Sequence, residues 1–169
     1  MWGRRKKNYP RSKCKKNRKQ NRGLCDCCIE AMRSIITQLV GQTIAVRSAN
    51  SFIGMVPPQP IVNRYLTRLS GGEIISICQI LYLAIDSSLV QELVLEPIRR
   101  DEGKCGCCED PMTEFLNQNV GNVFVFTFTN AESTVAQILR VGEGIVILAN
   151  NEGTTLVAST CKLDSIRPL

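Results

Sequence analysis

The amino-acid sequence predicts a mainly β fold of the α+β class, with two tandem small β-barrel modules, each preceded by a short α-helix, after a disordered basic arm. Three observations predict this: the chain matches itself at an offset of 80 residues, an apolar pattern of helical period follows each Cys-x-Cys-Cys motif, and short β-forming runs follow each helix. They divide the 169 residues into the arm (1–24), a first module (25–86), a linker (87–104) and a second module (105–169).

The arm is predicted from its charge. It holds eleven of the 21 Lys and Arg residues and no Asp or Glu, so the rest of the chain, with ten basic and fifteen acidic residues, has a net charge of −5. Like charges repel, and few apolar side chains are present to form a core, so the segment is expected to be disordered. Three roles stay open for it: a solvated tail, a contact with an acidic surface of another copy, or a salt-sensitive contact with nucleic acid. The basic residues concerned are Arg4, Arg5, Lys6, Lys7, Arg11, Lys13, Lys15, Lys16, Arg18, Lys19 and Arg22.

The repeat is clearest around the cysteine motifs. Between 25–41 and 105–121, seven of seventeen positions are identical, three of them cysteines. The register then slips by about three residues, and 76–80 matches 159–163, so that each module ends with one late cysteine. The similar lengths and the shared pattern predict that the two modules pack as a pseudo-twofold pair.

A short helix is predicted at each motif because apolar residues recur there at helical spacing. These residues are Cys28, Met32, Ile35, Ile36 and Leu39 in the first copy, and Cys108, Met112, Phe115 and Leu116 in the second. Asp110 and Pro111 suit the first positions of a helix, where an Asp cap and a fixed proline φ are favourable. Gly41 and Gly121 suit the far ends, where a left-handed residue is preferred.

Five short strands are predicted in the second module, at 123–128, 134–141, 145–148, 154–158 and 162–166. Turn-forming residues separate them. Closing these strands into a small barrel would remove their free edges.

The first module repeats the pattern with interruptions. Pro57, Pro58 and Pro60 predict that its second strand ends early or lies at an edge. The repeat alignment predicts strand over 74–85, and the linker run Leu89 to Leu95 can add a further strand.

The nine cysteines permit three hypotheses. The preferred one is disulfide cross-linking, within a module or between chains, since an odd total suits intermolecular pairing. The second is one four-thiolate zinc site per module. The third treats the late and helix-facing thiols as buried small apolar residues. The cysteines concerned are Cys25, Cys27, Cys28 and Cys78 in the first module, Cys105, Cys107, Cys108 and Cys161 in the second, and Cys14 in the arm.

The chain contains no histidine. This excludes Ser-His-Asp and Cys-His catalysis and His-ligated metals, so we predict that the protein is not an enzyme and needs no cofactor, with zinc as the alternative. The longest apolar run, 74–85, is shorter than the roughly 18–20 residues of a membrane span, and no secretory signal follows the N-terminal charges. We therefore expect synthesis inside the cell without a signal peptide, and no membrane partner.

The second module resembles the Sm-like and SH3-like small β-barrels. The resemblance is carried by Val120-Gly121, Val141-Gly142, Gly153-Thr154-Thr155 and the run from Cys161 to Ile166. It implies the fold. The Asp-x-hydrophobic-Asn and Arg-Gly motifs with which Sm proteins read RNA are missing from the sequence, so the resemblance does not extend to RNA reading through the barrel.

The chain as a whole resembles the cysteine-rich coat and exosporium proteins of bacterial endospores. The two Cys-x-Cys-Cys motifs, each before a helix and a β-rich module, and the basic arm carry this resemblance. It implies a structural protein of a spore surface layer that assembles with itself and with other Cys-rich structural proteins, its cysteines being assembly sites. The alternatives are a Sm-like nucleic-acid-binding protein that uses the arm, and a zinc-binding interaction module.

Overall fold

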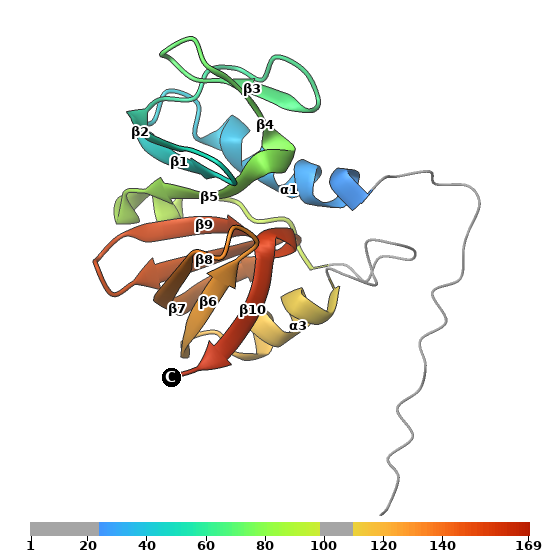
Figure 1. The fold of residues 1–169 in the computed structure, drawn as a ribbon, viewed down its shortest axis with the longest axis vertical. Helices are drawn as coiled ribbons and strands as arrows, with labels where there is room; N and C mark the ends of the chain where they lie inside the picture. Colours follow the sequence, from blue (N-terminus) through green and yellow to red (C-terminus); the bar gives the residue numbers. More distant parts are fainter. Residues whose placement is uncertain (1–23, 99–109) are drawn as a thin grey trace, which may run out of the picture.

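The computed structural model describes residues 24–98 and 110–169 (Figure 1). The helices of this part are α1 (Leu24–Gln38) and α3 (Asp110–Gln118), with short 3-10 turns η1 (Ile77–Gln79), η2 (Ser87–Gln91) and η3 (Thr160–Lys162). The first half contains strands β1 (Ile44–Ser48), β2 (Phe52–Val56), β3 (Leu66–Arg68), β4 (Ile74–Ser76) and β5 (Ile80–Ile85). The second half contains β6 (Val123–Phe128), β7 (Ser133–Gly142), β8 (Ile145–Asn150), β9 (Thr155–Ser159) and β10 (Leu163–Pro168).

Eight of these strands form one antiparallel sheet in the order β10-β6-β7-β8-β9-β5-β1-β2, and β3 pairs with β4 in a separate hairpin. The prediction of a mainly β fold is therefore confirmed. The prediction of two closed barrels is not, since the sheet remains open in the described part of the chain.

The repeat is visible in the strand register. Ala45 lies opposite Ala84 between β1 and β5, and the equivalent positions Val125 and Arg167 lie opposite each other between β6 and β10. Both pairs of strands contain an irregularity at the equivalent place, before the last pairing at Ser48 and at Phe128. The two halves thus place their first and fifth strands in the same way.

The strand predicted over 74–85 is confirmed at both ends but not in its middle. It is two strands, β4 and β5, separated by η1. The physical reason is that β4 pairs with β3 whereas β5 pairs with β1 and β9, so the chain must turn a corner between two sheets. The second half makes the same corner at η3, between β9 and β10.

The helices and glycines lie where the sequence pattern predicts them, with one exception in α3. Met32, Ile35 and Ile36 of α1 are buried, as is Leu39 directly after the helix. In α3 Leu116 is buried, but Phe115, predicted on the same apolar face, is 41% exposed. The glycines that follow the helices have positive φ, 82° at Gly41 and 90° at Gly121, a conformation that glycine adopts without a Cβ clash.

The prolines act as predicted, because β2 ends at Val56 and lies at the edge of the eight-stranded sheet. The chain beyond it stays close to the β3–β4 hairpin through a bridge between Pro58 and Leu69.

The predicted linker strand from Leu89 to Leu95 is wrong. The segment begins as η2 and then runs without regular structure. Its buried side chains Val90 and Leu93 anchor it, and Arg140 of β7 donates from Nη1 to both of their carbonyl oxygens, at 2.6 and 3.0 Å. These carbonyls accept from a side chain rather than from a neighbouring strand, so the linker is a strap across the two halves.

The halves do not form a pseudo-twofold pair. A twofold axis would pair equivalent strands, but the junction pairs β5, the fifth strand of the first half, with β9, the fourth strand of the second. The cores interpenetrate at this junction. Leu81 of β5 packs in the second-half cluster, which contains buried side chains of β6, β7 and β8. Val157 of β9 packs in the first-half cluster, which contains buried side chains of α1 and β1.

Candidate assembly site: the cysteine turns and the junction between the halves

Two of the predicted cysteines occupy equivalent turns. Cys78 lies in η1 and Cys161 in η3, each directly before the fifth strand of its half. Both residues are disulfide-bonded. The sequence alignment of these positions therefore corresponds to a shared place in the fold and a shared oxidation state.

The cysteines of the first motif lie in the first turns of α1, which starts at Leu24. This helix packs against η1, and also against η3 and β9 of the other half. The structure thus brings the helix that carries Cys25, Cys27 and Cys28 beside both late-cysteine turns. The sequence had grouped the thiols by module, and the structure adds that α1 of the first half also lies beside η3 of the second.

The other predicted site residues lie outside the described part of the chain. They are Cys14, Cys105, Cys107, Cys108 and the eleven Lys and Arg residues of the arm. The roles predicted for them stay predictions.

The described residues contain no group of three or more Cys, His, Asp or Glu side chains that could hold a metal ion. A thiol ligates zinc as its thiolate, and a disulfide sulfur cannot do so. Cys78 and Cys161 in their bonded form are therefore not zinc ligands, and a zinc site that includes them requires their reduction.

The junction itself is a regular antiparallel ladder. Leu83 lies opposite Val157, and Ala84 lies opposite Leu156. All four side chains are apolar, and three of them are fully or almost fully buried, which removes water from the ladder. The two halves are consequently joined by main-chain pairing together with a shared core.

A polar cluster crosses the same junction. Glu132, in the turn before β7, accepts from Arg47 Nε of β1 at 2.6 Å and from the Tyr82 hydroxyl of β5 at 2.8 Å. Asn130 Nδ2 donates to the same carboxylate at 3.2 Å. One second-half carboxylate is therefore held by two first-half side chains.

Burial and bonding oppose each other at this carboxylate. Desolvation by itself would raise the pKa of Glu132, but hydrogen bonds from Tyr82, Arg47 and Asn130 stabilise the ionised form, and the net effect lowers its pKa. Burial raises the pKa of Tyr82, and its hydrogen bond to Glu132 raises it further. The lowered pKa keeps Glu132 ionised near neutral pH, and the raised pKa keeps Tyr82 a neutral donor.

Sequence reasoning missed this cluster. Its members are separated by 85 residues between Arg47 and Glu132 and by 50 between Tyr82 and Glu132, and no motif links them. Only the order of strands at the junction brings them together.

The comparisons with known proteins provide no relative. The chain matches no protein-family model, no curated protein and no solved structure. A separate search of the described helices finds none that is long and apolar enough to cross a membrane.

Proposed function

We propose that this protein is a structural subunit that assembles with copies of itself into a disulfide-stabilised layer, of the kind found around bacterial endospores. The observation that carries the proposal is the pair of equivalent turns with disulfide-bonded cysteines, Cys78 and Cys161, beside the helix that bears the first cysteine motif. Each half of the chain thus carries a disulfide-bonded cysteine at the same place in the fold, which suits a subunit whose layer is stabilised by disulfides.

The cysteine count supports bonds between chains. The chain has nine cysteines, and because nine is odd, pairing within one chain leaves at least one cysteine over. In an oxidising layer that thiol can join a neighbouring subunit. The partners would be other copies of this chain and other Cys-rich structural proteins, at the spore surface.

At the level of the fold, we propose that each half is a small barrel of the Sm-like or SH3-like type. The support is that each half has five strands in the same order, with a 3-10 turn between the fourth and the fifth. In the first half the bridge between Pro58 and Leu69 continues the second strand toward the β3–β4 hairpin. The proposal includes no catalytic activity, since a chain without histidine offers no visible nucleophile and base pair.

The test is the intact mass of the purified protein, measured without reductant and then with it. Covalent multimers that become monomers of 18.8 kDa on reduction are the expected result. A protein that is entirely monomeric without reductant overturns the proposal. A monomer that carries about two zinc ions, lost with a chelator, replaces it with the zinc-binding alternative.

The nucleic-acid alternative rests on the charge of the arm. It predicts binding to RNA or DNA that weakens steeply with salt and is lost when residues 1–23 are deleted. Binding that survives this deletion excludes the arm as the contact.

A further inference from the structure

Each of the two strands that join the halves has an equivalent strand whose corresponding edge is unpaired in the described residues. The junction pairs β9, a fourth strand, with β5, a fifth strand. The other fourth strand, β4, and the other fifth strand, β10, are its structural equivalents. Within residues 24–98 and 110–169, β4 pairs with β3 alone and β10 pairs with β6 alone. Each therefore presents one open edge of main-chain donors and acceptors, and such edges tend to pair with another chain.

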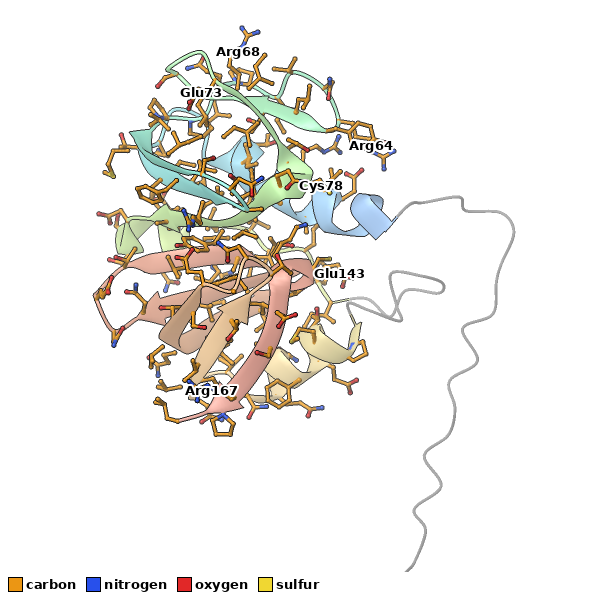
Figure 2. The ribbon with its side chains drawn as sticks, in the orientation of Figure 1. Arg64, Arg68, Glu73, Cys78, Glu143 and Arg167 are labelled. Carbon is orange, nitrogen blue, oxygen red and sulfur yellow. The ribbon has the colours of Figure 1, made fainter. Side chains whose placement is uncertain are left out.

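These two edges lie at opposite ends of the molecule. Figure 1 shows the β3–β4 hairpin at the top and β10 reaching the bottom, with the β5–β9 junction between them. Figure 2 likewise places Glu73, which precedes β4, and Arg167 of β10 at opposite ends. The two edges cannot meet within one chain, so only a second molecule can join them.

The known junction defines the register that the open edges would adopt. Moving both of its strands by the 83-residue offset that relates η1 to η3 converts β9 to β4 and β5 to β10. The junction pair Leu83 and Val157 then corresponds to Ile166 and Ile74. The junction pair Ala84 and Leu156 corresponds to Arg167 and Glu73. The register therefore predicts one apolar pair and one ion pair.

The apolar pair accounts for an exposed side chain. Val157 is 0% exposed and packs in a core cluster together with its partner Leu83, whereas its equivalent Ile74 is 52% exposed. A paired strand that places Ile166 opposite Ile74 would reduce the exposure of Ile74, as Leu83 lies opposite the buried Val157. The cost of leaving such a side chain in water is removed by the contact.

The ion pair provides specificity. Glu73 and Arg167 are both exposed, their charges are opposite, and the proposed register places them directly across from each other. Opposite charges at facing positions of antiparallel strands are favourable and like charges are unfavourable. The internal junction has uncharged residues at the same positions, so this pair distinguishes the contact between molecules from the contact within one.

We propose that copies of this chain associate head to tail, the β10 edge of one copy pairing antiparallel with the β4 edge of the next through Ile166–Ile74 and Arg167–Glu73. This inference rests on the proposed function and names its subunit contact. The contact joins two different surfaces, so repetition produces a ring if the rotation closes and a filament if it does not.

The contact is short. β4 has three residues, and Pro168 ends the usable edge of β10 because proline has no main-chain donor. Asp164 and Ser165 stand at the positions equivalent to Leu81 and Tyr82 of β5, so no further apolar side chain of β10 extends the contact in that direction. A weak and reversible pairing follows, which disulfide bonds between chains can then fix in place.

A charge swap tests the contact in the full-length chain. Sedimentation velocity over a dilution series, in reductant, measures association without disulfides for Glu73→Arg, for Arg167→Glu and for the double variant. Glu152→Arg is the matched control, because Glu152 lies in the equivalent hairpin of the second half, next to β9, whose edge is already covered by β5. Thermal melts confirm that each variant is folded.

Each single reversal is expected to weaken association about tenfold, because it turns an attraction into a repulsion at every contact. The double variant should return to within about threefold of the original chain, and Glu152→Arg should match the original chain. The head-to-tail contact is overturned if the single variants associate as strongly as the original chain. It is also overturned if the double variant is folded but still associates weakly.

Non-reducing gels separate this inference from the proposed function. If covalent multimers form but the charge reversals do not change association, the contact is overturned and the proposal of a cross-linked layer is kept. Swap-sensitive association in reductant without any covalent multimers supports the contact and overturns disulfide stabilisation. A chain that is monomeric in both conditions overturns both.

Discussion

Replacing Leu81 by alanine should destabilise both halves of the chain, although Leu81 belongs to the first half. Its side chain is 0% exposed and packs in the second-half cluster with Leu116, Phe126 and Leu148. The substitution removes three buried carbon atoms, about 2.4 kcal/mol at roughly 0.8 kcal/mol each, and leaves a cavity in a core formed by two segments. The total cost should be about 3 kcal/mol, within the range for buried Leu→Ala changes.

Hydrogen exchange measured by mass spectrometry reads this cost separately for each strand. If the eight-stranded sheet unfolds as one unit, a loss of about 3 kcal/mol raises the exchange rates of core amides in β1 and in β8 alike, by roughly 150-fold. The matched control is Phe52→Ala on β2, which is 60% exposed at the far edge of the sheet and should change stability by less than about 0.5 kcal/mol.

The reasoning is refuted if protection in β8 is unchanged in Leu81→Ala while β1 exchanges faster. That result would mean that the halves unfold independently and that the β5–β9 ladder opens without cost to the second half. Faster exchange in Phe52→Ala of the same size would mean that the effect does not depend on the shared core.

Three further predictions follow from the turns and the polar cluster. Glu132→Gln should cost about 1–3 kcal/mol at neutral pH. Folding lowers the pKa of Glu132, so the stabilisation by its carboxylate is present above the unfolded pKa of about 4.3 and is lost as the pH falls through the folded pKa. The urea midpoints of the variant and the original chain should therefore converge in acid and stay apart at neutral pH. Gly121→Ala should lower stability by about 1–2 kcal/mol because its φ is 90°, whereas Gly71→Ala, where φ is not positive and a Cβ meets nothing within 4 Å, should be nearly neutral in the same thermal melts. Reduction of the disulfides that hold Cys78 and Cys161 should lower the free energy of unfolding by about 2–4 kcal/mol, and equal melting temperatures with and without reductant would contradict it.

Local patterns predicted the second half well. Its strands lie where alternating β-forming runs and turn residues placed them, and α3 begins at Asp110 as the Asp-Pro pair indicated. These features depend on neighbours in the sequence: a fixed proline φ, a glycine with positive φ, and side chains that alternate across a strand. In the first half the same kind of local signal, the proline cluster, correctly ended β2.

Local patterns failed where one segment serves two partners. No residue in the apolar run 74–85 indicates the turn at η1, because the position of this turn depends on the two sheets between which the chain crosses. The linker run Leu89 to Leu95 has strand-like residues, but Val90 and Leu93 are buried as anchors of a strap and their carbonyls accept from Arg140. Hydrophobic content alone does not distinguish these uses.

The sequence by itself determined that the chain contains one β-rich unit twice, with equivalent cysteines, since a repeat is a property of residue order. Only the tertiary structure decided how the two units meet. The pairing of β5 with β9, the exchange of Leu81 and Val157 between cores, and the Glu132 cluster are contacts across the chain. These contacts stabilise the fold through side-chain packing and strand register between residues that are far apart in the sequence. No pattern of neighbouring residues predicts which strands will pair in this way.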